Sequence, residues 1–227
     1  MLGTLINVAT VLAGGAIGLL IKKGMPKRFE KGLMAALGLC VIYIGISGLK
    51  EVENTLVIIL SMVIGTIIGE AFDLDKQINR LGDFVKRKVS RNDKNSKIAE
   101  GFVSASLLFC VGAMTIVGSL QSGLTGNNET LFAKSMLDFV SALLLASSFG
   151  VGVLLSAVFV LVYQGGITLL AGLLAPVLTD VVIAEMSCVG SLILIALALN
   201  MLGISKLKVM NFVPAIFLPM LLCLFIK

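Results

Sequence analysis

The chain has 227 residues, of which 58% are hydrophobic and 14% are charged, and its net charge is +5. A soluble globular protein is about a quarter charged, so this composition excludes a water-soluble domain and indicates an integral membrane protein. The sequence contains no His, which excludes catalysis and metal binding that depend on an imidazole.

The apolar residues form stretches long enough to cross a membrane, for which about 20 residues are needed. In chain order these are Leu2–Ile21, Leu33–Leu49, Thr55–Phe72, Gly101–Leu120, Phe132–Pro176, Val181–Ile204 and Val209–Ile226. The fifth stretch is long enough for two crossings, and Phe149-Gly150-Val151-Gly152 predicts a tight turn between them. We therefore predict an all-α, polytopic membrane helix bundle, a single transmembrane domain over residues 1–227, with about eight spans and seven as the alternative.

The basic residues predict the orientation of these spans. Fifteen of the 18 Lys and Arg residues lie in three loops, at positions 22–31, 76–97 and 206–208. With eight spans these loops share one side of the membrane, whereas the loops at 51–54 and 126–129 on the other side are acidic or neutral. Because positive loops remain in the cytoplasm, we expect the N-terminus outside. The cations then face a membrane surface, and we expect no nucleic acid partner.

The largest loop, residues 74–100, has a helical pattern of its own. Leu74, Ile78, Leu81, Val85 and Val89 recur at helical spacing with basic residues between them. This pattern is typical of an amphipathic helix on the cytoplasmic leaflet. We expect residues 76–97 to contact anionic lipid headgroups.

Two further patterns concern how the spans pack. Met34-x-x-x-Gly38 in the second span matches Met186-x-x-x-Gly190 in the seventh, which runs the opposite way. An internal inverted repeat, a common transporter architecture, would explain this match. Gly14-x-x-x-Gly18 and Gly65-x-x-x-Gly69 predict close helix packing, either within the bundle or across a homo-oligomer.

Ionisable residues inside a membrane are costly and indicate a site. Lys134 and Asp138 are four residues apart, so they lie on one face of the fifth span and can form a pair. Asp138 is one turn deeper than Lys134, whose ammonium group has the alternative of reaching the outer interface. Glu70 and Glu185 lie nearer to the ends of their spans, where we expect them to be solvated.

Neutral polar residues complete the expected binding site. Thr115 and Ser119 share one face of the fourth span, with Gln121 beside them. In the sixth span, Gly165 and Gly166 lie between Gln164 and Thr168 near the middle. The glycine pair predicts either an unwound segment, whose carbonyls and flanking side chains would bind a cation, or a close helix approach.

These features predict a transporter or channel for a small solute or ion, with sodium as a candidate coupling ion. The alternative is a structural or regulatory membrane subunit that acts through protein partners. The sequence has no nucleophile–base pair or phosphate loop, and its four cysteines lack metal-ligand spacing, so we expect neither an enzyme nor a cofactor.

Four segments resemble one bacterial family of membrane proteins. They are Gly3-Thr-Leu-Ile-Asn7, Phe109–Gly123, Lys134-Ser-Met-Leu-Asp138 and Tyr163–Thr168. Together they resemble the YdfK/YqgA-like integral membrane proteins over essentially the whole chain. The resemblance implies a multi-pass protein of the bacterial cytoplasmic membrane. It implies no function, because the family is a domain-of-unknown-function family, and no site residue can be taken from it.

Overall fold

A computed structural model describes residues 1–22, 26–77, 79–80, 98–110 and 113–225. Every regular element in these ranges is a helix. Five helices are long and apolar enough to cross a membrane, namely α1 (Leu2–Lys22), α3 (Thr55–Phe72), α7 (Glu129–Phe149), α8 (Gly152–Leu169) and α10 (Asp180–Met201). The all-α membrane helix bundle is therefore confirmed.

The remaining apolar segments are shorter or bent. α5 (Ile98–Cys110) and α6 (Ala113–Leu124) meet at an angle of 60° and give a sixth span if they are counted as one. α2 (Lys27–Gly48), and η2 (Val209–Phe217) followed by α11 (Pro219–Leu222), contain shorter apolar helices. A short helix, α9 (Ala171–Leu174), follows α8. The described residues thus contain five or six candidate spans, and the count of about eight, with seven as the alternative, stays a prediction. Most of the expected amphipathic segment at 74–100 lies outside the described residues.

The outer surface of the bundle is apolar. Ile67 on α3, Val162 on α8 and Met136 on α7 are 64%, 67% and 76% exposed. A soluble protein does not expose so many large apolar side chains together, whereas lipid solvates them well. The exposed side chains therefore agree with a bundle that lies in a bilayer.

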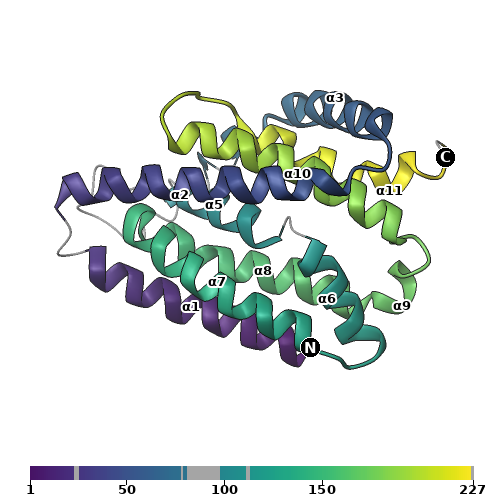
Figure 1. The fold of residues 1–227 in the computed structure, drawn as a ribbon, viewed down its shortest axis with the longest axis horizontal. Coiled ribbons are helices and arrows are strands. Elements are labelled where there is room, and N and C mark those ends of the chain that lie inside the picture. Colours follow the sequence, from purple (N-terminus) through teal and green to yellow (C-terminus); the bar gives the residue numbers. More distant parts are fainter. Residues whose placement is uncertain (23–25, 78, 81–97, 111–112, 226–227) are drawn as a thin grey trace.

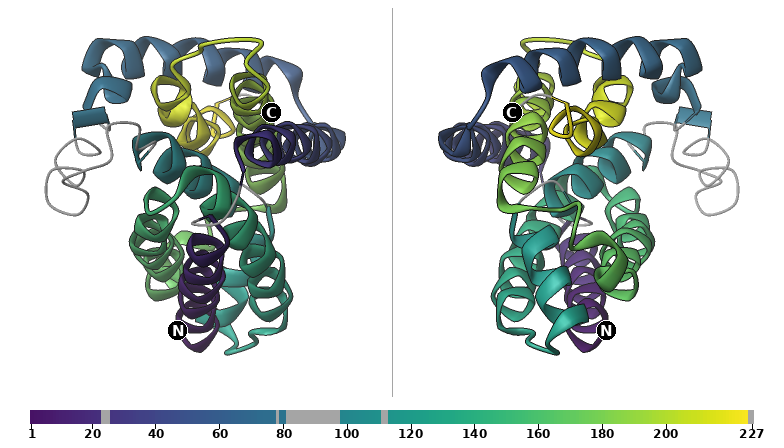
Figure 2. Two further views of the ribbon diagram at one scale, coloured as in Figure 1. Left: turned by 90° about the vertical axis from the view of Figure 1, so that its left-hand side faces the viewer. Right: turned by 90° about the vertical axis from the view of Figure 1, so that its right-hand side faces the viewer.

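The helices form two groups in Figure 2, in which most helices are seen end-on and α3 lies lengthwise across the top. One group contains α1, α6, α7 and α8, and the other contains α2, α3, α10 and η2, with α5 between them. α10 is the most buried of the five long helices and contacts members of both groups. The two groups meet along α5, α6, α7, α2 and α10, and the cavity described below lies at this junction.

Successive helices run in alternating directions (Figure 1). α1 ends, α2 begins and α10 connects to η2 at one end of the bundle, on the left of Figure 1. We call this the basic end, because Lys22, Lys27, Lys206 and Lys208 belong to these segments. α2 connects to α3, and α6 to α7, at the opposite end, toward which both termini also lie. This arrangement places the described parts of the basic loops at 22–31 and 206–208 at the same end, as the sequence predicts, whereas most of the loop at 76–97 lies outside the described residues. The side of the membrane that these loops face stays a prediction.

Glycines allow two helix pairs to approach closely within the bundle. A Cβ atom on Gly14 or Gly18 of α1 would lie 2.3 Å from a backbone oxygen of α7. A Cβ atom on Gly69 of α3 would lie 1.9 Å from the carbonyl oxygen of Asn211 on η2. Both GxxxG motifs therefore serve packing within one chain, which answers the alternative that the sequence left open.

The expected turn after α7 is confirmed, and the last segment of the chain is irregular as well. The chain turns between α7 and α8 at Gly150, whose φ of 84° favours glycine. The last segment is a 3-10 helix with Pro214 inside it, and α11 begins at Pro219. Since proline lacks an amide hydrogen, the two prolines prevent one continuous α-helix there.

Candidate functional site

Lys134 and Asp138 form a buried ion pair on α7. Their side chains are 7% and 8% exposed, and the Lys134 ammonium contacts Asp138 Oδ2. The ammonium group also lies 6.0 Å from the centre of the Phe109 ring, within the range of a cation–π interaction. Lys134 thus points inward to its partner and does not reach the outer interface, because a lone Asp138 carboxylate would be costly at this depth.

Asn7 on α1 connects this pair to α8. Its Nδ2 atom donates to Asp138 Oδ2 and to Gln164 Oε1, both at 2.9 Å. Asn7 and Gln164 are both 0% exposed. The two amide hydrogens of Asn7 are therefore used, whereas its Oδ1 atom is buried and has no partner among the described residues.

The hydrogen bonds continue from Gln164 to two threonines. Gln164 Nε2 lies 3.4 Å from Thr4 Oγ1, which in turn lies 3.4 Å from Thr168 Oγ1. Thr168 also donates to the Gln164 carbonyl at 2.9 Å. We call the connected set the polar chain; its members are Lys134, Asp138, Asn7, Gln164, Thr4 and Thr168. It runs through three helices that are far apart in the sequence.

A cavity of about 360 Å³ lies beside Asp138 and Lys134. We call it the Asp138 cavity. Its polar lining comes from α2, α6, α7 and α10, and consists of Ser47, Thr115, Lys134, Asp138, Ser141, Ser187 and Ser191. Its apolar lining includes Ile44, Leu108, Met114, Leu137 and Leu194. The cavity therefore combines both signs of charge with hydroxyl groups inside an apolar bundle.

The break between α5 and α6 brings Thr115 to this cavity. Thr115 is 0% exposed, and its hydroxyl donates to the Phe109 carbonyl at 2.9 Å, across the break. Side chains that satisfy freed carbonyls are what allow a helix to be interrupted inside a membrane. The bent pair of α5 and α6 therefore covers the residues of the expected fourth span.

The glycine pair of α8 is not an interruption, and the expected unwound segment there is wrong. α8 is helical through Gly165 and Gly166, and the Gly166 carbonyl accepts from Leu170 at 2.9 Å. The helix ends only at Leu170. A Cβ atom on Gly165 would meet α1 at ordinary contact distances, and one on Gly166 would meet nothing within 4 Å. Gln164 and Thr168 are thus placed by a regular helix, and the Gly166 carbonyl is not free to bind a cation.

The other predicted residues of α6 divide between the interior and the helix end. Ser119 is 0% exposed, and its hydroxyl has no partner among the described residues. Gln121 Oε1 instead accepts from Thr130 at 2.8 Å and joins α6 to α7. Neither residue lines the Asp138 cavity. The predicted polar face of the fourth span does point inward, since Thr115, Ser119 and Ser122 are all buried.

Sequence comparison places the whole chain in one family. Residues 2–224 match the family model described as "Protein of unknown function (DUF554)". The chain belongs to the DUF554 family. It is 32% identical to the "Uncharacterized membrane protein YdfK" of Bacillus subtilis, over 96% of this chain and 94% of the relative. It is 31% identical to the "Uncharacterized protein YqgA" of Escherichia coli, over 97% and 95%. No solved structure matches the chain. The resemblance seen in the sequence is confirmed, and a multi-pass membrane protein agrees with the name of the first relative.

Sequence reasoning missed several residues of this DUF554 site. Asn7 and Thr4 belong to a segment that carries the family resemblance, but the sequence predicted no role for either residue. Both lie on one face of α1, at i, i+3 spacing. An Asn inside an apolar span is the signal that could have identified Asn7. Ser141, Ser187 and Ser191 give weaker signals, because serine is common in transmembrane helices.

Glu185 differs from its predicted environment. It is 0% exposed, and its Oε1 atom accepts from the backbone amides of Glu53 and Asn54, just before α3. The prediction of a solvated Glu185 is therefore wrong, because the loop before α3 folds over the start of α10. Glu70 does lie in solvent, 3.7 Å from Lys208.

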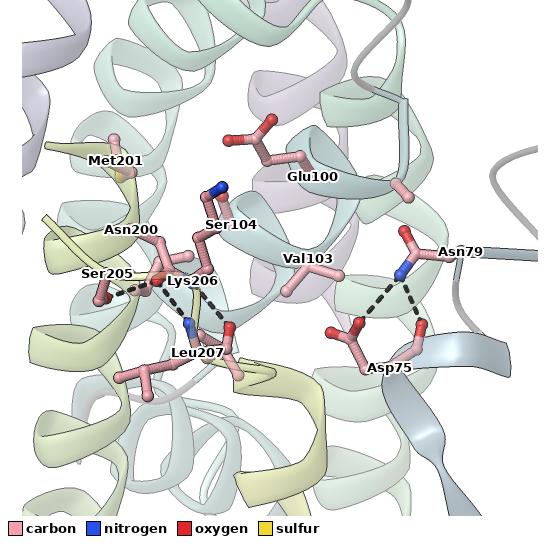
Figure 3. Close-up of a pocket in the computed structure, with 13 residues that line it drawn as sticks. Asp75, Asn79, Glu100, Val103, Ser104, Asn200, Met201, Ser205, Lys206 and Leu207 are labelled. Carbon is pink, nitrogen blue, oxygen red and sulfur yellow. Dashed lines mark hydrogen bonds between the residues drawn. The ribbon is translucent and has the colours of Figure 1, made fainter. Parts of the chain in front are cut away.

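A second pocket of about 290 Å³ lies at the basic end (Figure 3). Asn200 organises one wall of it, since its Nδ2 donates to the Leu207 carbonyl and its Oδ1 accepts from Ser205 and from the Leu207 amide. Asn200 therefore orders the loop after α10. Asp75, on the other wall, accepts from Asn79 at 3.0 Å.

Two charged groups at the basic end have altered pKa values. Burial raises the pKa of Asp75, although the Lys208 charge and the Asn79 hydrogen bond partly oppose this. Asp73 and Glu70 raise the pKa of the exposed Lys208. The basic end thus has a small network of opposite charges close to the second pocket.

Proposed function

We propose that this DUF554 protein moves a small solute or ion across the membrane. The path would be lined by α5 and α6, by α7 and by α8, with α1 as a further wall and with α2 and α10 completing the cavity. The observation that supports this most is the Asp138 cavity together with the polar chain that leads from it. Buried polar and charged groups inside a membrane are costly, and they typically mark substrate or ion pathways.

The way the helices pair supports a transport mechanism. α2 packs against α10, and α3 against η2, in antiparallel fashion, whereas α1 runs parallel to α7 and α5 runs parallel to α8. These contacts are symmetric under an exchange of α1, α2 and α3 with α8, α10 and η2, respectively, and of α5–α6 with α7. The α2–α10 and α3–η2 contacts then map onto themselves, and the α1–α7 contact maps onto the α5–α8 contact. An inverted repeat would produce this pattern, and it would include the match between the second and seventh spans. Such repeats let a central site open alternately to the two sides of a membrane.

The alternative function is a membrane subunit that acts only through partners. Such a protein would need no water in its interior. The two functions therefore differ in whether reagents dissolved in water reach the Asp138 cavity, and this can be measured before any substrate is known.

Cysteine accessibility tests the proposal. In a variant whose four native cysteines are replaced by alanine, Ser187→Cys and Thr115→Cys place a thiol in the cavity wall. We expect both to react with a charged, membrane-impermeant thiol reagent, and from either side of the membrane, because a transport site opens alternately to both. Met136→Cys on the lipid-facing side of α7 is the matched control and should not react. Cavity thiols that react from neither side, or from one side only, would contradict transport and favour the subunit.

A further inference from the structure

The Asp138 cavity has features that identify a substrate class. Resting on the transport function proposed above, we infer that the cavity binds a small zwitterion, in which two to four atoms separate the ammonium nitrogen from the charged oxygen. A free α-amino acid and the aminoethyl-phosphate headgroup of a lipid share this chemistry. The observations that support it are the charges, the hydroxyl groups, the volume and the opening of the cavity.

The charges favour a ligand with both signs. Lys134 and Asp138 are adjacent on one face of α7 and are the only charged residues in the cavity lining. A ligand ammonium next to Asp138 and a ligand oxyanion next to Lys134 would complete a square of alternating charges. A lone cation such as sodium would lie close to the Lys134 ammonium, and a lone anion would lie close to the Asp138 carboxylate. Only a zwitterion gains from both residues.

Asp138 has capacity for such a ligand. Its Oδ2 atom accepts hydrogen bonds from both Lys134 and Asn7, and its Oδ1 atom accepts none within the described residues. Ionised carboxylates accept several hydrogen bonds, so an ammonium group can donate to Oδ1 while the existing bonds remain. The polar chain then holds Asp138 in place from the side away from the cavity.

Hydroxyl groups add further donors and acceptors. Ser47, Ser141 and Ser187 line the cavity from α2, α7 and α10, and their hydroxyls make no hydrogen bond within the described residues. Three unpaired hydroxyls from three helices can surround a charged group without adding charge.

The size and opening of the cavity limit the ligand. About 360 Å³ is enough for a small amino acid, and the apolar wall at Leu108 and Leu194 fits an aliphatic group. Ile44, Met114 and Leu137 also line the cavity and are 43%, 40% and 60% exposed, so it reaches the lipid-facing surface between α2, α6 and α7. A ligand can therefore enter from water or as a headgroup from the bilayer.

Binding measurements separate these sources. The purified wild-type protein in phosphatidylglycerol nanodiscs is titrated with L-alanine, with propionate and ethylamine as analogues that lack one charge, and with sodium chloride. A second arm adds phosphatidylethanolamine to the nanodiscs, with phosphatidylcholine as a control whose quaternary ammonium donates no hydrogen bond. We expect L-alanine or phosphatidylethanolamine to raise the Tm, and neither single-charge analogue nor phosphatidylcholine to do so.

Variants locate the effect in the cavity. Ser141→Phe fills the cavity and should abolish the Tm shift, and Ser187→Ala should weaken apparent binding about three- to tenfold by removing one hydrogen bond. Ser135→Ala is the matched control, because Ser135 lies on α7 outside the cavity and bonds to the Leu131 carbonyl. It should bind like the wild type.

Three results would contradict the proposal that the cavity binds a zwitterion. They are a Tm shift with sodium alone, an equal shift with propionate or ethylamine, and a shift that Ser141→Phe leaves unchanged. If no probe binds but the cavity thiols react from both sides, zwitterion binding is also contradicted, whereas the proposed transport function stands. Cavity thiols that do not react would instead remove the transport function itself.

Discussion

Asn7 connects three helices through a single nitrogen atom. Among the described residues, it alone joins the Lys134–Asp138 pair to Gln164, and its side chain is fully buried. The i, i+4 spacing of Lys134 and Asp138 was enough to predict that they pair, because that contact is local. The contact of Asn7 with Asp138 spans 131 residues, and no local rule gives the register of α1 against α7. Half of the site could therefore be predicted from the sequence, and the half that depends on α1 could not.

Replacing Asn7 by leucine tests this connection. Asn7→Leu keeps the approximate volume but leaves Gln164 Oε1 without its donor and Asp138 with one donor fewer. We expect a loss of about 1–3 kcal/mol in the free energy of unfolding, measured by denaturation in increasing SDS. Thr66→Val is the control, since Thr66 bonds only to the carbonyl one turn before it on α3, and it should lose much less. Equal losses in both variants would show that the connection contributes nothing specific.

Asp75 gives a pH-dependent prediction. Burial raises its pKa, so the folded protein holds this proton more tightly than the unfolded chain does. The resulting stabilisation is present below the usual Asp pKa and is lost as the pH rises through the folded-state value. Asp75→Asn should therefore raise the Tm at pH 7, and this advantage over the wild type should shrink as the pH falls toward about 4. A lower Tm at pH 7 would mean that the bond from Asn79 outweighs burial.

At the scale of elements, the apolar stretches gave the positions of the helices well. The turn at Gly150 was predicted correctly, because it depends on local backbone chemistry. The position of the broken helix was not predicted correctly. Gly165 and Gly166 predicted either a break in α8 or a close helix approach, but the helical hydrogen bonds there are intact, and the break lies between α5 and α6. Glycine permits a break in a helix without requiring one, and packing against the neighbouring helices determines whether the helix breaks.

Two glycine substitutions distinguish conformational freedom from close packing. Gly166→Ala meets nothing within 4 Å and should gain up to about 1 kcal/mol, because alanine favours a helix. Gly69→Ala would force its Cβ against the Asn211 carbonyl and should lose about 1–3 kcal/mol. SDS denaturation measures both. A destabilising Gly166→Ala would show that α8 requires a flexible point at this position.

At the scale of the whole molecule, the alternating helix directions place both termini toward the end opposite the basic loops. The distribution of Lys and Arg along the sequence had already predicted this grouping, since it needs only the count of spans and the charges between them. The two-group arrangement, with a cavity at the junction, was not predictable. It depends on which helix faces contact each other, and most faces of these helices are similarly apolar.

Reporter fusions test the membrane orientation. With eight spans and the N-terminus outside, alkaline phosphatase fused after residue 227 should be active, because it folds only outside the cytoplasm. Green fluorescent protein inserted after Gly203, in the loop before η2, should fluoresce, because it matures in the cytoplasm. An inactive phosphatase at the C-terminus would indicate an odd number of spans.

The long-range contacts of α1 also determine when the site can form. Gln164 is 157 residues from Asn7, and at about 5–20 residues per second a ribosome needs about 8–30 s to make that length. During this time α1 is already made while Thr4 and Asn7 still lack the partners that they have in the finished bundle. α1 is made before its partners and is thus among the last helices to be completed, and its polar face needs water, lipid headgroups or an insertion factor until α8 arrives.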